Sequence, residues 1–507
     1  MYLQSILIAL CGCTVLVESV AVREETSHSS SDACKSLAKR LPNSVFFPGS
    51  SSYANDNVHF VQSSSQNSTC SVEPQTVNDV GTILKTVGSL KVPFGIKSSG
   101  HIANANFSST SGVQISMTAF DNVSYDSTTS TVKIGTGQSW DVVYAKLESL
   151  EVTVAGGRVP GVGVGGLALG GGFSWITDQH GLTVDTMVAF DLVLPNGTFV
   201  QVNNASNPDL FFALKGGFNN FGIVTSFTMT AYPLTQIWGG GITFNTSFMN
   251  EVNSAMSNFS FNNTDSKAQM IGAYSIDGTG EVIPSSYVLS ILLMRPLKST
   301  LAVYLFYDAP TKPDAFDAFL SIPSLTQDVK VRNFTEFLLT SFGPAMHLPL
   351  REKQHAVPIL KYTTSILETI EKEVDALYNQ AVADAKQIEN VLFSIEPFQH
   401  PFAHSTDSAY PHPSDRQVTP STPSLLYVNA DDESYFENAL KGLVKAVQSV
   451  SIQEDQSRSD DLYYPNYALA DTPLEQVFGS SLPRLRKIRH EIDPDNVMLL
   501  TGGFKFI

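Results

Sequence analysis

Short runs of alternating apolar and polar residues fill the first half of the chain. Residues Val113 to Met117, Thr131 to Gly135, Met187 to Leu194 and Thr225 to Thr230 alternate with a period of two, which is typical of β-strands. Apolar residues from Trp140 to Leu150 recur instead with the period of a helix. The pattern therefore predicts a strand-rich first half with a short amphipathic helix.

The second half combines strand-like runs with longer helical patterns. Residues Leu301 to Tyr307 favour a strand, whereas Tyr362 to Asp384, Asp432 to Ser449 and Pro483 to Glu491 favour helices. A chain of 507 residues is long enough for two domains. We expect an α+β fold in which helices cover a sheet in the second half.

Glycines are concentrated between Gly156 and Gly172, which indicates that the backbone approaches something closely. Gly161, Gly163 and Gly166 match the G-x-G-x-x-G motif of a nicotinamide-binding Rossmann domain. In that motif the glycines lead into a helix, but here Gly170 to Gly172 would lie inside it, where each glycine costs about 0.5–1 kcal/mol relative to alanine. A Rossmann domain is therefore the less favoured alternative.

A histidine follows a turn of small residues in Lys97-Ser98-Ser99-Gly100-His101. Small neighbours leave its ring accessible, and a neutral imidazole can attack the electrophilic 8α-methyl carbon of an oxidised flavin. A single histidine after a glycine is more often a turn or surface residue. The flavin interpretation therefore depends on the segments that follow along the chain.

Those segments match one family in order. They run from Lys97–His101 through Val162–Gly166, Leu169–Gly172, Gly181–Asp185, Asn207–Gly217 and Asn220–Thr225 to Tyr464–Tyr467. The chain resembles the FAD-linked oxidases with a PCMH-type FAD-binding domain, in the berberine-bridge-enzyme-like branch of the oxygen-dependent FAD-linked oxidoreductases. The resemblance implies an α+β fold with a two-part PCMH-type FAD-binding domain and a substrate domain whose antiparallel sheet is covered by helices. The FAD-binding domain would span residues 57–235 and the substrate-binding domain 236–455, and a C-terminal segment, 456–507, would return to the FAD-binding domain.

The resemblance also implies that one covalent bond joins FAD to His101. Ile223 and Val224 would lie beside the bound nucleotide, and Asn466 would approach the flavin. Two loops would cradle the pyrophosphate with their amides, and their residues are Lys97, Ser98, Ser99 and Gly100 in the first and Gly161, Val162, Gly163, Gly165 and Gly166 in the second.

Four positions depart from the family's pattern. Val159 stands where some members have a cysteine that makes a second bond to the flavin, so a single covalent attachment is expected. Leu167 and Phe173 replace a histidine and a tyrosine of many members, which removes a polar flavin partner and a commonly used base. Lys97 replaces the family's arginine and keeps its charge without the planar fork.

Charge and composition exclude some classes of function. There are 48 acidic and 31 basic residues, which give a formal net charge of −17 with no basic cluster, so no nucleic-acid partner is expected. His400, His404 and His412 are spaced like metal ligands, but prolines at positions 401, 411 and 413 would break a helix that aligned them. We expect a loop without a metal site, and a monomeric protein.

The N-terminal residues predict export. Residues 1–21 are predicted to form a signal peptide, with an apolar region from Ile6 to Val17 that is too short to span a bilayer. Cys34 and Cys70 remain in the mature chain as an even pair, for which we expect a disulfide in an oxidising compartment. Glycosylation sequons stand at Asn67, Asn106, Asn122, Asn196, Asn204, Asn245, Asn258, Asn262 and Asn333. We expect a secreted or secretory-pathway glycoprotein with no stable membrane insertion.

Together these inferences predict a flavin oxidase that removes a hydride from a C–H bond next to a hydroxyl or amine of a small molecule. Tyr464 is the candidate base, and O₂ would reoxidise the flavin and give H₂O₂. The apolar replacements Leu167 and Phe173 favour a secondary metabolite as the substrate. A carbohydrate oxidase, which would need an open polar groove, is the alternative, and a flavin-fold binding module without activity is a more distant one.

Overall fold

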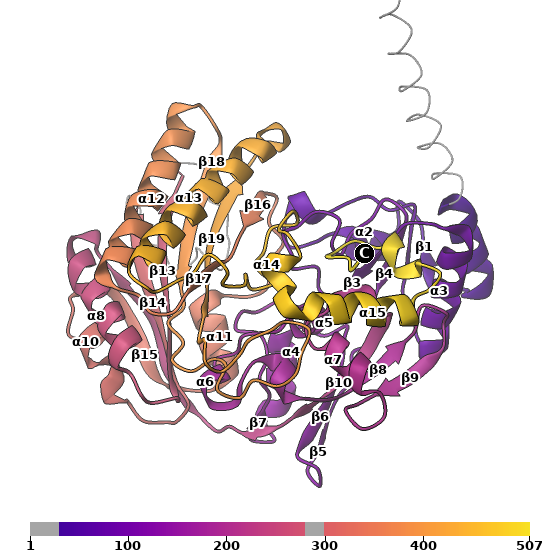
Figure 1. The fold of residues 1–507 in the computed structure, drawn as a ribbon, viewed down its shortest axis with the longest axis horizontal. Coiled ribbons are helices and arrows are strands. Elements are labelled where there is room, and N and C mark those ends of the chain that lie inside the picture. Colours follow the sequence, from indigo (N-terminus) through magenta and orange to yellow (C-terminus); the bar gives the residue numbers. More distant parts are fainter. Residues whose placement is uncertain (1–29, 279–298) are drawn as a thin grey trace, which may run out of the picture.

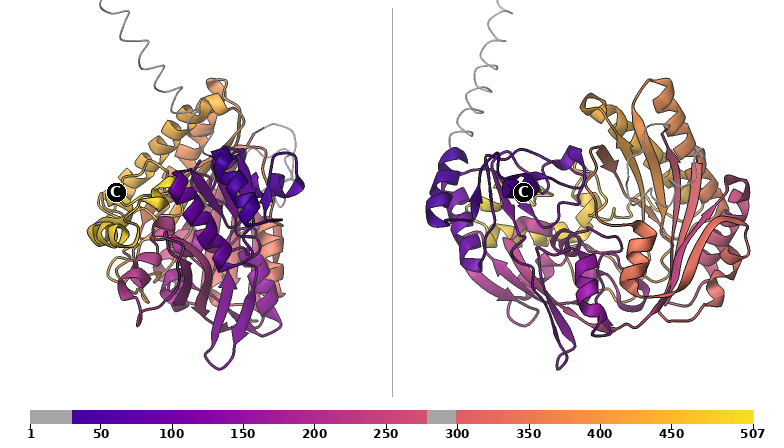
Figure 2. Two further views of the ribbon diagram at one scale, coloured as in Figure 1. Left: turned by 90° about the vertical axis from the view of Figure 1, so that its right-hand side faces the viewer. Right: turned by 180° about the vertical axis from the view of Figure 1, so that it is seen from behind.

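The computed structural model describes residues 30–278 and 299–507 (Figure 1, Figure 2). The signal peptide predicted at residues 1–21 lies outside the described residues. The described chain forms two halves, of which the first is built mainly on a four-stranded and a five-stranded sheet and the second on one large sheet. No helix in the two described ranges is both long and apolar enough to cross a membrane.

The four-stranded sheet forms the N-terminal part of the first half. Its order is β1-β2-β4-β3, and β4 runs parallel to both β2 and β3. A capping box of Thr76 and Asp79 begins helix α3, whose buried residues Ile83 and Leu84 share one apolar cluster with the sheet. The elements are β1 (Val45–Phe46), α2 (Ser51–Asn57), η1 (Gln62–Ser64), β2 (Cys70–Val72), α3 (Val77–Leu90), β3 (Phe94–Lys97) and β4 (Val113–Ser116).

The five-stranded sheet is antiparallel, with the order β5-β6-β10-β8-β9. Helix α4 begins at Trp140 as the sequence pattern predicts, but it ends at Glu148 because the chain turns at Glu151, whose φ is +54°. The elements are β5 (Val123–Asp126), β6 (Thr131–Gly135), α4 (Trp140–Glu148), β7 (Val152–Thr153), α5 (Val164–Leu169), α6 (Thr177–His180), β8 (Met187–Val193), β9 (Phe199–Val202), α7 (Pro208–Leu214), β10 (Ile223–Thr230) and β11 (Tyr232–Pro233).

The second half is built on an eight-stranded antiparallel sheet. Its successive neighbours are β15-β12-β14-β13-β18-β19-β16, and β17 also pairs with β19. The elements are β12 (Ile237–Phe244), α8 (Met249–Asn262), β13 (Ala268–Asp277), β14 (Ser299–Tyr307), α10 (Asp317–Leu320), β15 (Ser324–Arg332), α11 (Phe334–Phe342), β16 (Arg351–Gln354), β17 (Val357–Ile359), α12 (Thr364–Ala383), β18 (Ile388–Ile395), β19 (Thr419–Tyr427) and α13 (Glu433–Gln453).

Alternation along the central strands divides this sheet into two faces. Helices α8, α12 and α13 cover one face, where Tyr274, Phe393 and Leu425 are buried in the same apolar cluster as Ile370 and Leu440 of the helices. The opposite face is directed toward the first half of the molecule. Mixed helices and mainly antiparallel sheets confirm the predicted α+β fold.

The C-terminal segment leaves the second half and returns to the first. Its helices are α14 (Glu475–Phe478) and α15 (Leu482–Ile492), drawn in yellow across the first half in Figure 1. Arg484 of α15 pairs with Asp209 of α7 at 2.6 Å, and Asn220 donates to the carbonyl of Phe504. The last residues of the chain therefore close the first half.

Cys34 and Cys70 form a disulfide, which confirms the predicted pairing. Both cysteines are buried, and the bridge closes a chain segment with a sequence separation of 36 residues. We expect the double variant Cys34→Ala/Cys70→Ala to lose about 4 kcal/mol of unfolding free energy, because the unfolded chain regains loop entropy. Denaturant unfolding measures this loss, and a midpoint equal to that of the wild type would contradict it.

Candidate active site

A cavity of about 330 Å³ lies between the two halves. Its wall combines loops of the first half, residues of the C-terminal segment and one face of the large sheet. Within the described ranges, Lys97 and Gly161 are not part of this wall. The predicted site residues that the wall does contain are Ser98, Ser99, Gly100, His101, Val162, Gly163, Gly165, Gly166, Ile223, Val224, Tyr464 and Asn466.

The two predicted cofactor loops lie back to back. The hydroxyl of Ser98 donates to the carbonyl of Thr136 and accepts from the amide of Gly165 at 3.2 Å. A Cβ at Gly163 would lie 2.7 Å from Oγ of Ser98, so only glycine allows this approach. The hydrogen bonds of Ser98 in the first loop therefore require glycine at position 163 in the second loop.

Several hydrogen-bond donors on the cavity wall have no acceptor in the described part of the chain. The amides of Ser98, Ser99 and Gly100 donate to no described group, and the buried hydroxyl of Ser108 has no partner there. A Cβ at Gly166 would meet no atom within 4 Å. Free amides beside open space fit the phosphates of a nucleotide cofactor.

His101 lies on the cavity wall with its ring stacked on Phe60 at 4.1 Å between centroids and an interplanar angle of 8°. Burial, with a smaller contribution from His347, lowers the pKa of His101 to about 4. The imidazole is therefore neutral at neutral pH. A neutral ring on the wall has the protonation state that attack on an electrophilic carbon requires.

The side chain of Lys97 points away from the cavity wall. Its ammonium donates to the carbonyl of Asn55 at 2.6 Å, behind the loop. Burial lowers the pKa of Lys97 to about 8, and the nearby carboxyl of Asp56 opposes that shift. The side chain thus anchors helix α2 to the end of β3.

The C-terminal segment places two predicted residues at the cavity. The phenol oxygen of Tyr464 accepts from the amide of Gly172 at 3.1 Å and from Nδ2 of Asn466 at 2.9 Å. Asn466 also donates to the carbonyls of Leu167 and Gly170, and a Cβ at Gly170 would collide with Asn466. Burial raises the pKa of Tyr464, and the bond from Asn466 opposes the shift.

Sequence reasoning missed a buried polar cluster on the same wall. Arg158 pairs with Glu396 at 2.6 Å, and the exposed fractions of these side chains are 6% and 3%. Arg158 also donates to the phenol of Tyr467 at 2.9 Å, and Tyr467 donates to Glu396 at 3.3 Å. Burial raises the pKa of Glu396, and Arg158 opposes the shift. Arg158 lies in the glycine run and Glu396 directly after β18, so no local sequence signal connects them.

A second buried pair lies outside the cavity wall. Nε2 of His412 contacts the carboxylate of Asp185 at 3.0 Å, and Nδ1 contacts the carbonyl of Tyr410 at 2.7 Å. Burial opposes ionisation of Asp185, but hydrogen bonds from His412 and Thr406 leave its pKa lowered. The histidine loop predicted from the prolines is therefore a structural contact between the two halves. No cluster of metal-ligating side chains occurs within residues 30–278 and 299–507.

The comparisons agree with this geometry. Residues 68–203 match the FAD binding domain family. Physcomitrella patens BBE-like 1 has the same fold with a TM-score of 0.73, at 19% identity over 92% of this chain and 97% of that one. The carbohydrate oxidase from Microdochium nivale matches with a TM-score of 0.73, at 19% identity over 92% of this chain and 98% of that one.

One relative establishes the family to which the chain belongs. The FAD-dependent monooxygenase sdcF of Emericella nidulans is 30% identical over 497 residues, which cover 93% of this chain and 98% of that protein. The chain belongs to the berberine-bridge-enzyme-like FAD-linked oxidoreductases. This FAD-linked oxidoreductase has free amides and open space in the two loops that the family resemblance assigns to the cofactor, and its residues fit FAD.

Gly166 and Gly442 provide a matched pair of substitutions, because a Cβ at either position meets no protein atom within 4 Å. Gly166 lines the cavity, whereas Gly442 is exposed on α13. We expect Gly166→Ala to lower the flavin content of the purified protein and to leave the unfolding midpoint of the flavin-free protein unchanged. Gly442→Ala should keep the flavin content of the wild type. Absorbance at the flavin band per protein measures both, and equal flavin in the two variants would contradict a cofactor at Gly166.

Proposed function

We propose that this oxidoreductase is an oxidase that holds FAD by a single covalent bond from His101. The carrying observation is the neutral His101 ring on the cavity wall, next to the free amides of Ser98, Ser99 and Gly100. Val159 also lines the wall and has no thiol, which supports one covalent bond rather than two. The substrate is a small molecule, and the bond oxidised is a C–H next to a hydroxyl or amine.

Bound FAD would supply hydride acceptance, and its reoxidation by O₂ would use the two electrons and two protons to give H₂O₂. Tyr464 receives the proton that the substrate hydroxyl or amine loses in the same oxidation. To accept that proton Tyr464 must first be ionised, and the N–H donors of Gly172 and Asn466 stabilise the negative charge of the phenolate until the proton transfer neutralises it. Edge contacts with Phe173 and Tyr467, each at 4.9 Å between ring centroids, hold the Tyr464 ring in place.

The cavity supports a metabolite of mixed polarity. Leu167, Leu169 and Phe173 give the side near the glycine run an apolar wall, which supports a secondary metabolite. Ser394 and Ser424 place hydroxyls on the opposite wall, and these favour the alternative of a carbohydrate substrate. A binding module without activity is the least supported function, because it leaves the neutral His101 and the contacts of Tyr464 without a role.

We also propose that the protein matures in the secretory pathway. The Cys34–Cys70 disulfide supports an oxidising compartment. None of the nine predicted glycosylation sequons has a buried asparagine: Asn245 is partly buried, and the other eight are exposed. These positions are open to a glycan without any change in the fold.

The covalent bond is tested by acid precipitation of the purified protein. Wild type should retain yellow colour in the pellet, whereas His101→Ala should release all flavin to the supernatant. His404→Ala is the control, because His404 is exposed and lies outside the cavity wall. Because attack needs a neutral imidazole, attachment of added FAD should increase as the pH rises through about 4 rather than through the ordinary histidine range. Flavin released by acid from the wild type would refute the proposal.

The base is tested by stopped-flow reduction without oxygen, using a compound that reduces the wild type. Tyr464→Phe should keep its covalent flavin and reduce about 10²–10⁴ times more slowly. The control is Tyr463→Phe, because the Tyr463 hydroxyl donates to Gln448 away from the cavity wall. Since burial raises the pKa of Tyr464, the wild-type rate should increase toward alkaline pH. An unchanged rate in Tyr464→Phe would assign the proton to another group.

A further inference from the structure

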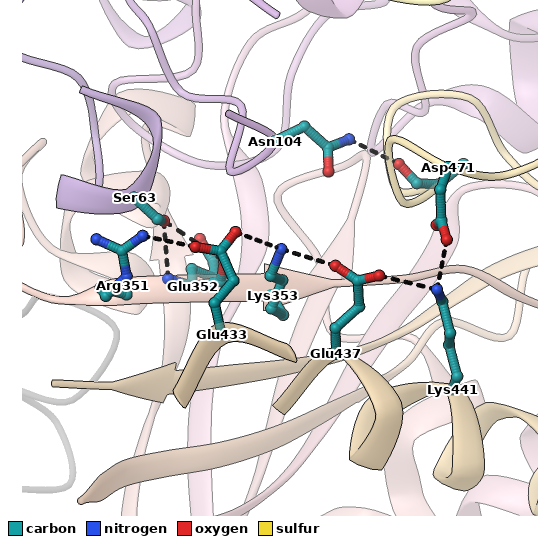
Figure 3. A network of polar contacts seen from close by, with 10 residues as sticks. Ser63, Asn104, Arg351, Glu352, Lys353, Glu433, Glu437, Lys441 and Asp471 are labelled. Carbon is teal, nitrogen blue, oxygen red and sulfur yellow. Dashed lines mark hydrogen bonds and ion pairs between the residues drawn. The ribbon is translucent and has the colours of Figure 1, made fainter. Parts of the chain in front are cut away.

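The two faces of strand β16 make different contacts. Glu352 and Gln354 line the cavity, whereas Arg351 and Lys353 point to helix α13 (Figure 3). This division follows from the two-residue period of a strand. The hydroxyl of Ser63 contacts the backbone of Glu352, accepting from its amide at 3.0 Å, and holds the strand against the first half.

The cations of β16 pair with carboxylates on the outer face of the strand. Arg351 pairs with Glu433 at 2.8 Å, and Lys353 pairs with both Glu433 and Glu437 at 2.9 Å. A further lysine, Lys441, extends this row of alternating charges from Glu437 toward the C-terminal segment (Figure 3). No positive charge of β16 is therefore left for the cavity side.

The carboxyl of Glu352 has no ion-pair partner and no hydrogen-bond donor in the described part of the chain. On β19 Leu426 lies opposite Glu352, and η1 contributes Ser63, so neither of these neighbours adds a charge. On the rest of the described wall, Arg158 is neutralised by Glu396, and His101 is neutral at neutral pH. The described wall thus carries one carboxyl group without a counter-charge.

We propose that Glu352 selects substrates that carry a protonated amine, a specificity that rests on the oxidase function proposed above. An ammonium group would supply both the missing charge and the missing hydrogen-bond donors. Ser424 lines the same wall, and its hydroxyl would accept a remaining N–H group of the ligand. The acidic chain, with its net charge of −17, also attracts cations.

Burial raises the pKa of Glu352 to about 7, which makes the proposal sensitive to pH. Between pH 6 and pH 8 the ionised fraction rises from about one tenth to about nine tenths. A primary alkyl ammonium stays protonated over that range. Affinity for an amine should therefore increase about tenfold, while affinity for a neutral alcohol of the same shape should not change.

The experiment is isothermal titration calorimetry of the purified protein, as isolated and without oxygen, with 2-phenylethylamine and 2-phenylethanol at pH 6 and pH 8. Wild type should prefer the amine at pH 8, and Glu352→Gln should bind both probes alike at both values of pH. Glu368→Gln is the control, because Glu368 is exposed on α12 behind the sheet and should leave the preference intact. A pH dependence of the amine affinity that came from His347 rather than from Glu352 would persist in Glu352→Gln.

Several outcomes would overturn the proposal. They are the absence of amine binding, an equal affinity of the wild type for both probes, and an amine preference that survives in Glu352→Gln. If Glu352→Gln does not fold, the wild-type comparison between pH 6 and pH 8 decides, and a flat amine affinity refutes the proposal. Calorimetry measures binding and requires no turnover. The oxidase function is tested separately by acid precipitation and flavin reduction, so failure of one proposal can be distinguished from failure of the other.

Discussion

The active site depends on contact between the glycine run and the C-terminal segment. Gly171 and Gly172 take φ values of +109° and +83°, and the absence of a side chain at Gly170 leaves room for Asn466. Asn466 and Tyr464 then satisfy backbone groups of the glycine run. The same few atoms close the cavity, hold the phenol and connect distant parts of the chain, so the site exists only when the last residues have docked.

Two buried polar pairs join the two halves, and one of them, Arg158 with Glu396, is an ion pair. Arg158 reaches Glu396 across the cavity wall, and Asp185 meets His412 behind it. Removing charges from water is costly, and a buried pair adds little net stability compared with apolar residues of the same size. Such a pair instead favours one relative orientation of its partners, because misalignment leaves a buried charge unpaired. The pairs therefore favour one relative placement of the two halves.

Local patterns were sufficient for much of the fold and for part of the site. Strand β6 and helices α4, α12 and α13 follow from periodicity, because that signal depends on neighbours in sequence. The glycine loops were recognisable because small residues cluster there. Arg158, Glu396 and Glu352 were not, since each becomes significant only through what the fold brings to it. For Lys97 the charge was visible in the sequence, but the direction of the side chain, toward the carbonyl of Asn55, was not.

The two faces of β16 have a consequence for how this protein can change over evolutionary time. Odd-numbered positions of the strand hold it to α13, and even-numbered positions meet the cavity. A substitution at Glu352 or Gln354 can alter what the cavity accepts while the outer charge row stays in place. A one-residue shift in the register of the strand would instead exchange the two faces at once. New specificities are therefore accessible by point substitution in this strand, whereas a one-residue insertion within it is strongly constrained.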